Sequence, residues 1–208
     1  IHSREVEKMQ KKREGNYSLL LLAGGKSSRM GKDKAGLFLN GKTFPRHLTD
    51  KAEQLGIRQK FLSGHFMEEA DVRVVEDIYK DRGPLGGLHA CMKVMETPYC
   101  LVLPVDVPQI PLKVLEALLA AHEEKCMQGQ GEFPLLLAHG DREEPLIGIY
   151  PVKMADAVGE KSCWVFRILN QWGYETCEIP LEEWQGGNIN TPKEYELLLE
   201  YEKRGKIE

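Results

Sequence analysis

Residues 19–35 read LLLLAGGKSSRMGKDKA, and this stretch decides the fold. Four leucines and Ala23 form an apolar run that suits a buried β-strand and is far too short to span a membrane. Gly24 and Gly25 then let the main chain turn sharply and present bare N–H groups to a ligand. The next basic residues are Lys26, Arg29, Lys32 and Lys34. A buried strand that leads into a glycine turn and then into cations is typical of α/β proteins that bind phosphates.

Strand-like and helix-like segments alternate through the rest of the chain. Apolar spacing predicts helices over 44–55, 84–95, 111–124, 152–159, 164–172 and 192–201, and strands over 60–62, 72–75, 99–105, 135–138, 146–150 and 176–179. This alternation predicts a three-layer α/β/α sandwich with a mainly parallel sheet. Residues 17–208 are expected to form this one domain, and residues 1–16 a polar leader or linker. Trp164, Phe166 and Trp172 are expected to pack as the inner face of one helix.

Composition excludes several classes of protein. A formal net charge of −4 over 208 residues gives no global basic field, so we expect no nucleic-acid partner and only local phosphate binding. The five cysteines are odd in number and never spaced C-x-x-C, which favours reduced thiols over disulfides or a zinc site. No signal peptide or long apolar segment is present in the sequence, so we expect a cytoplasmic protein without a membrane anchor.

Carboxylates follow two of the other predicted strands. Asp77 comes shortly after the strand over 72–75, and Asp106 stands between prolines at the end of the strand over 99–105. Ligands of parallel sheets bind beyond the carboxyl ends of the strands, so both acids are expected in one crevice with the glycine turn. An aspartate in such a place is equally often a turn former or a helix cap, and position alone leaves both interpretations open.

The string L-A-G-G-x-S-x-R-M-G-x-D-K-A is met at every fixed position from Leu22 to Ala35. It resembles the signature of the molybdenum cofactor guanylyltransferases (molybdopterin-guanine dinucleotide biosynthesis protein A), within the nucleotidyltransferase superfamily. Three further segments similar to motifs of that family follow in the same order: DRGPLGG at 81–87, PVDVP at 104–108 and NINTP at 188–192. The resemblance implies a Rossmann-like fold of the nucleotide-diphospho-sugar-transferase type.

The resemblance also implies an activity. The chain would transfer GMP from GTP to the phosphate of molybdopterin, would release pyrophosphate and would depend on Mg²⁺. Molybdoenzyme apoproteins or cofactor-insertion proteins would be its partners downstream.

Site residues follow from the same resemblance. The nucleotide-binding set would be Leu22, Ala23, Gly24, Gly25, Lys34, Ser63, Asp77 and Asp106. The catalytic residues would be Arg29, Lys34 and Asp106, with Asp106 as the ligand of Mg²⁺. The acceptor or metal side would comprise Arg142, Lys161, Asn188 and Asn190.

Two stretches depart from the usual family pattern. Many members place an asparagine after the strand that precedes Asp77, where this chain reads FLSGH at 61–65. Many also place a histidine before the proline near residue 146, where this chain reads DREEP at 141–145. Guanine selectivity and the acceptor side are therefore open. The alternatives are a cytidylyl- or sugar-phosphate nucleotidyltransferase, and a non-catalytic molybdopterin-binding domain of a larger fused protein.

Overall fold

A computed structural model describes residues 2–23, 36–64, 71–78, 82–159 and 164–207. Within these ranges a seven-stranded sheet runs in the order β5–β4–β1–β6–β8–β7–β9. Its strands are β1 (Tyr17–Leu22), β4 (Gln59–Ser63), β5 (Arg73–Val75), β6 (Tyr99–Pro104), β7 (Leu135–His139), β8 (Arg142–Pro151) and β9 (Glu175–Glu178). Neighbouring strands are parallel except at β8, which runs antiparallel to both β6 and β7. The predicted mainly parallel sheet is confirmed.

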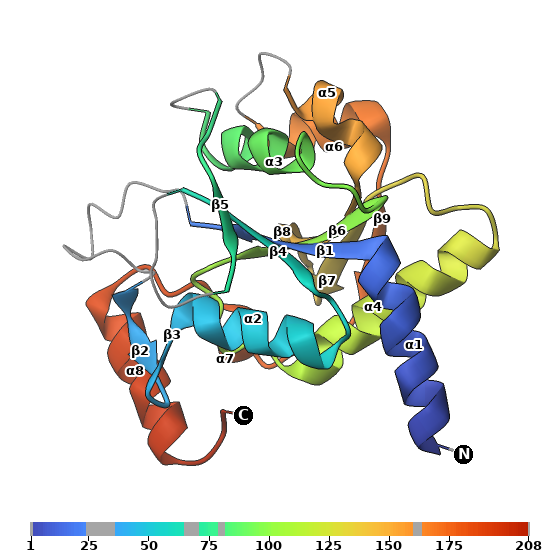
Figure 1. Ribbon diagram of the computed structural model, residues 1–208. Coiled ribbons are helices and arrows are strands. Elements are labelled where there is room, and N and C mark those ends of the chain that lie inside the picture. The colour runs from blue at the N-terminus through green and yellow to red at the C-terminus, as the bar shows by residue number, and fades with distance from the viewer. Residues whose placement is uncertain (1, 24–35, 65–70, 79–81, 160–163, 208) are drawn as a thin grey trace.

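Helices cover both faces of this sheet (Figure 1). One face carries α3 (Pro84–Met92), the short 3-10 helix η2 (Val152–Met154), α5 (Ala155–Val158) and α6 (Val165–Trp172). The other carries α2 (Phe44–Gln54) and α4 (Leu112–Met127), with α7 (Glu183–Gly186) and α8 (Pro192–Lys203) beyond them. A small hairpin of β2 (Phe38–Leu39) and β3 (Lys42–Thr43) lies beside α8. The three-layer α/β/α sandwich is therefore confirmed.

The leucine run of β1 explains why the sheet is buried on both faces. Leu19 and Leu21 belong to the apolar core under α2 and α4, whereas Leu20 and Leu22 belong to the core under α3. Successive side chains of a strand point to opposite faces, so a strand that is covered on both sides reads as a continuous apolar run.

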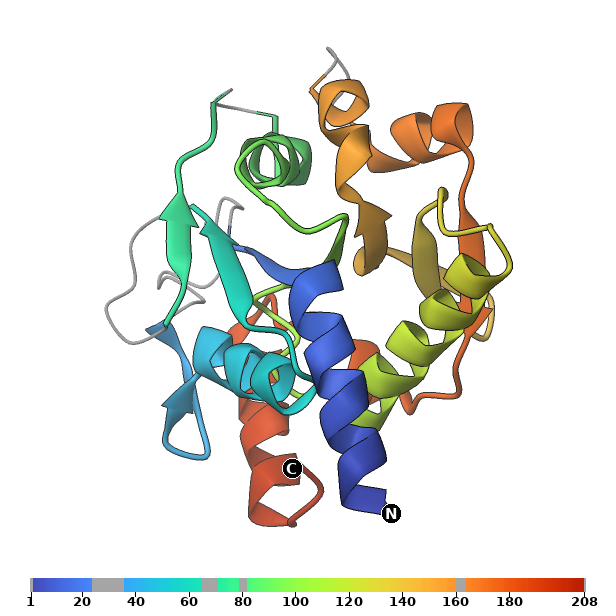
Figure 2. The ribbon, with the colours of Figure 1, turned by 45° about the vertical axis from the view of Figure 1, so that its right-hand side comes forward.

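The first segment of the chain is a helix, α1 (His2–Asn16), which leads directly into β1. Nε of Arg13 donates to Oε1 of Glu123 on α4 at 2.9 Å, and the Arg13 side chain is only 3% exposed. Gln10 passes so close to Gly56 that a Cβ on that glycine would lie 2.6 Å from the Gln10 Cα. Figure 2 shows α1 standing against α2 and α4. The polar segment expected over 1–16 thus packs on the sandwich through its C-terminal half.

Helix α6 differs from the sequence expectation. Trp164 is 76% exposed and Phe166 is 40% exposed, so these two rings do not form a buried helix face. The helix instead buries Ile168 and Leu169. It lies over the outer part of the sheet, where one narrow apolar stripe meets the core and the remaining positions face solvent. None of the helices in the described ranges is both long and apolar enough to cross a membrane.

Candidate active site at the carboxyl edge of the sheet

Four strand ends lie in one row at the carboxyl edge of the sheet. Leu22 pairs with Ser63 of β4 on one side and with Pro104 of β6 on the other. Ser63 in turn pairs with Val75 of β5. The ladder continues one step further, since the Ala23 N–H donates to the Ser63 carbonyl at 3.0 Å. The residues that follow these ends therefore emerge side by side, as the sequence predicts for a ligand crevice.

Ser63 and Asp77 are joined across the ends of β4 and β5. Oγ of Ser63 donates to Oδ1 of Asp77 at 2.9 Å. Gly87, near the start of α3, packs its backbone against this pair. A Cβ at Gly87 would lie 1.9 Å from the Ser63 Oγ and 3.3 Å from the Asp77 Oδ1. Only a glycine fits at this distance, so the DRGPLGG segment brings helix backbone directly onto the serine–aspartate pair.

Cys91 lies further along α3 and is fully buried. Burial raises the pKa of its thiol to about 12, and the charge of Asp77 adds to the shift. The thiol therefore stays protonated near neutral pH and is no nucleophile.

Asp106 is tied to the late NINTP segment. Its carbonyl accepts a hydrogen bond from the Ile189 N–H at 2.9 Å. Ile189 is buried in a third apolar cluster with residues of α8 and the β2–β3 hairpin. Asn190 Nδ2 donates to the Asn188 carbonyl at 3.4 Å. The two asparagines thus flank a residue that is anchored on Asp106, which brings three predicted site residues together.

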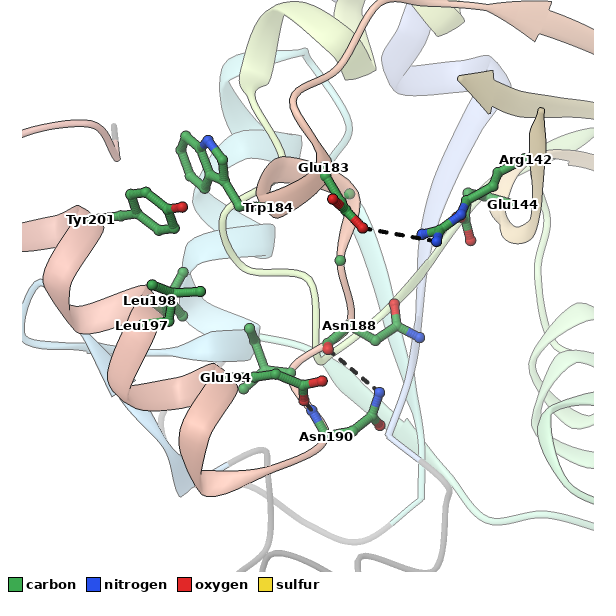
Figure 3. A pocket seen from close by; sticks show the side chains of 13 residues that line it. Arg142, Glu144, Glu183, Trp184, Asn188, Asn190, Glu194, Leu197, Leu198 and Tyr201 are labelled. Carbon is green, nitrogen blue, oxygen red and sulfur yellow. Dashed lines mark hydrogen bonds and ion pairs between the residues drawn. The ribbon is translucent and has the colours of Figure 1, made fainter. Parts of the chain in front are cut away.

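A groove of about 590 Å³ continues from these asparagines. It lies between α7, α8 and the turn that joins β7 to β8 (Figure 3). Its main side chains are Arg142, Glu144, Glu183, Trp184, Asn188, Asn190, Glu194, Leu197, Leu198 and Tyr201. Nη2 of Arg142 lies 3.9 Å from Oε1 of Glu183. The turn reaches this place because β8 is reversed, so that β7 ends and β8 begins at the same edge of the sheet where β6 ends.

The β7–β8 ladder is irregular just below this turn. Leu136 pairs with Gly148, but the next residue, Leu137, pairs with Glu144. Residues 145–147 therefore form a bulge in β8. The buried Tyr150 hydroxyl donates to the Pro145 carbonyl and fixes the bulge from inside.

The structure thus brings together most of the predicted site residues that it describes. Ser63, Asp77, Leu22 and Ala23 lie along the strand-end row, Asp106 lies with the two asparagines, and Arg142 lines the groove. The predicted residues Gly24, Gly25, Arg29, Lys34 and Lys161 lie outside the described residues.

Sequence reasoning missed other residues of the site. It gave no separate role to Gly87 and did not single out His139, Trp184 or Tyr201. The close contact of Gly87 with the Ser63 side chain joins residues far apart in the sequence, so no local pattern indicates it. The groove residues likewise come from separate elements that only the fold brings together.

The donor set at Asp106 suits Mg²⁺. Across the described ranges no three His, Cys, Asp or Glu side chains form a ready-made metal cage. Mg²⁺ is usually bound by one or two carboxylates together with substrate phosphates and water, and needs no such cage. Asp106 supplies such a single carboxylate just after β6, beside the end of β1.

Comparisons with known proteins agree with this geometry. Residues 19–162 match the family described as the MobA-like NTP transferase domain. A molybdenum cofactor guanylyltransferase of Pseudomonas fluorescens is 32% identical, over 85% of this chain and 90% of its own length. One from Xanthomonas euvesicatoria is 35% identical, over 86% and 93% respectively. Molybdopterin-guanine dinucleotide biosynthesis protein A of Archaeoglobus fulgidus has the same fold, with a TM-score of 0.68 at 21% identity over 90% of this chain and 99% of that one. This chain therefore belongs to the MobA-like nucleotidyltransferases, in the family of the molybdenum cofactor guanylyltransferases.

Proposed function

We propose that this chain, through a nucleotidyltransferase domain at 17–208, transfers GMP from GTP to the phosphate of molybdopterin and releases pyrophosphate. The observation that carries the proposal is the row of strand ends, because it aligns Leu22, Ser63 and Pro104 and so sets Asp77 and Asp106 on either side of the end of β1. The names of relatives at 32% and 35% identity over most of both chains support the same substrates.

The reaction forms one P–O bond and breaks another. A phosphate oxygen of molybdopterin attacks the α-phosphorus of GTP, and pyrophosphate leaves with the bonding electrons. The attacking oxygen is already an anion, so the step needs in-line positioning and compensation of charge more than a general base.

Each residue of the site receives a role in this proposal. The turn over Leu22 to Gly25 would hold the nucleotide, and Asp77 would bind its base or sugar. Arg29 and Lys34 offset charge on the α-phosphate and on the departing pyrophosphate. Asp106 would hold Mg²⁺, which when bound polarises phosphoryl oxygens as a Lewis acid.

In this proposal the acceptor binds in the groove lined by Asn188 and Asn190. Asn188 and Asn190 line the groove and flank the residue bonded to the Asp106 carbonyl. A molybdopterin in the groove would therefore reach Asp106 with its phosphate, beside Arg142, which lines the groove. Lys161, outside the described residues, is proposed for the same acceptor side.

The test is synthesis of the dinucleotide from GTP, molybdopterin and Mg²⁺, followed by chromatography and by pyrophosphate release. GTP is expected to outcompete CTP and UTP; a preference for CTP or UTP would support the cytidylyl- or sugar-phosphate alternative. Binding of molybdopterin with no pyrophosphate release would support the non-catalytic alternative.

Asp106→Ala tests the assigned site. We expect turnover to fall at least 100-fold, as for loss of a group that compensates developing charge. The thermal unfolding midpoint should stay near that of the unsubstituted protein, because the contact to Ile189 uses the Asp106 carbonyl and not its side chain. A near-normal rate would contradict the metal-ligand role.

A further inference from the structure

The groove beside Asp106 is acidic where the acceptor is proposed to lie. Its lining carries three carboxylates, Glu144, Glu183 and Glu194, against one guanidinium, that of Arg142. An acidic lining repels phosphate groups and favours a part of the ligand that presents N–H donors. The three carboxylates differ in their contacts, and these contacts show which of them is available to a ligand.

Two of the three are engaged elsewhere. Oε2 of Glu194 accepts from the Asn190 N–H at 2.7 Å and from the Thr191 N–H at 2.8 Å, so it caps α8. The Glu183 side chain is 87% exposed and lies 3.9 Å from Arg142, in a loose surface ion pair. Neither is a fixed and shielded acceptor for a ligand.

Glu144 is the carboxylate that is both partly buried and held in place by a neighbouring side chain. Its side chain is 25% exposed, and its Oε1 lies 3.3 Å from Nε2 of His139, whose side chain is 11% exposed. A carboxylate only accepts, so the histidine donates. Gly186 of α7 packs closely against the histidine ring, since a Cβ at Gly186 would lie 3.3 Å from the same Nε2. The pair links the two strands of the β7–β8 hairpin and presents Glu144 to the groove (Figure 3).

We propose that Glu144 binds the aminopyrimidinone edge of the acceptor's pterin ring, and that His139 is the residue that positions it. This inference rests on the proposed function and names the part of the acceptor that the groove recognises. A 2-amino-4-oxo pyrimidine presents an N–H and an NH₂ side by side, which a carboxylate accepts as a pair. The stacked rings of Trp184 and Tyr201, with centroids 4.6 Å apart, lie at the opposite end of the same groove from Glu144 (Figure 3), so the contact assigned to the pterin ring rests on the Glu144 end.

The shielding of Glu144 makes this contact selective. A ligand without the 2-amino group would leave one acceptor position of this partly buried carboxylate unfilled beside its bond to His139, so it is rejected more strongly than the loss of one exposed contact would suggest. The expected discrimination is about tenfold or more in affinity.

The test is a fluorescence titration of the full chain with a 6-substituted pterin phosphate and with its 2-deamino counterpart. We expect the unsubstituted protein to bind the pterin at least about tenfold more tightly, and Glu144→Gln to lose this preference. Glu143→Gln is the matched control: it makes the same change at the adjacent residue, whose Oε2 accepts from Tyr174 on the outer side of the hairpin. It should keep the preference.

His139 is tested with two variants. His139→Leu removes the donor and should weaken the preference, whereas His139→Gln retains an N–H donor and should restore part of it. Equal effects of the two variants would show that the ring only fills space, and would overturn the positioning role.

The inference and the proposed function fail in different ways. Equal binding of both probes by the unsubstituted protein, binding of neither, or loss of preference in Glu143→Gln as well would overturn the inference. A protein that binds the pterin selectively but makes no dinucleotide from GTP would contradict the proposed function and leave the inference standing. In the dinucleotide assay, Glu144→Gln should raise the KM for molybdopterin about tenfold or more and leave the KM for GTP unchanged.

Discussion

The Ser63 hydroxyl donates to Asp77 at 2.9 Å, and this bond joins the ends of two neighbouring parallel strands in the row that also holds the end of β1. Asp77 follows its strand by only two residues and is half-buried, so the bond decides where its carboxylate points. Under the proposed function, in which Asp77 binds the nucleotide, the serine would therefore act on the nucleotide through the aspartate.

Ser63→Ala should weaken GTP binding about 3- to 10-fold, the usual net effect of one lost hydrogen bond. Isothermal titration of GTP measures it. Ser18→Ala is the control: Ser18 also lies in the central sheet and bonds Thr97 at 2.7 Å, but at the opposite edge. Its loss should leave GTP affinity unchanged. An unaltered affinity in Ser63→Ala would contradict the assigned role of the bond.

Gly87→Ala should destabilise the fold by about 1–3 kcal/mol, because the new Cβ would meet the Ser63 Oγ at 1.9 Å and force strand and helix apart. Urea unfolding gives the free energy. Adding Ser63→Gly should recover part of the loss by removing the clashing atoms. Gly36→Ala, where nothing lies within 4 Å of the new Cβ, should cost little. An equal loss at the two glycines would contradict the close contact.

Arg13→Met should lower the free energy of unfolding by about 3 kcal/mol, because it leaves the Glu123 side chain, 13% exposed, without its partner. The double variant Arg13→Met, Glu123→Leu should regain most of that stability. Arg204→Met breaks a pair whose side chains are 64% and 59% exposed, and should change the free energy by less than about 1 kcal/mol. A loss at Arg13 no larger than that at Arg204 would show that α1 is not anchored through this contact.

The buried His122 should make the stability of the fold sensitive to acid. The pKa of His122 is lowered to about 4 by burial, and its Nδ1 lies 2.8 Å from the Tyr17 hydroxyl. Between an unfolded-state pKa of about 6.5 and the folded value, only the unfolded chain binds the proton. The free energy of unfolding should therefore be constant above about pH 7 and should fall by up to about 3 kcal/mol as the pH drops to 4.

The measurement is urea unfolding at a series of pH values for the unsubstituted protein and for His122→Gln. The difference between them isolates His122 from His47 and His89, whose pKa values burial also lowers. A difference that does not change between pH 7 and pH 4 would contradict the buried, neutral imidazole.

The sequence predicts the parts of this protein whose signals are local. The leucine run of β1 indicates a strand covered on both faces, and the positions of Asp77 and Asp106 after their strands predict a shared edge, which the register confirms. The exposure of Trp164 could not be predicted, because an aromatic ring in a short helix is buried only if another layer covers it. The pairing of His139 with Glu144 depends on the length of a hairpin, and neither residue carries a motif.

The bulge at 145–147 separates the hairpin end, with Arg142 and Glu144, from the part of β8 that pairs with β6 in the core. The three residues lie outside the β7–β8 ladder, while Ile147 within the bulge and Tyr150 behind it stay buried in the core. Under the proposed function, an altered choice of acceptor would therefore be sought at the hairpin end, with the row of strand ends assigned to the nucleotide left unchanged.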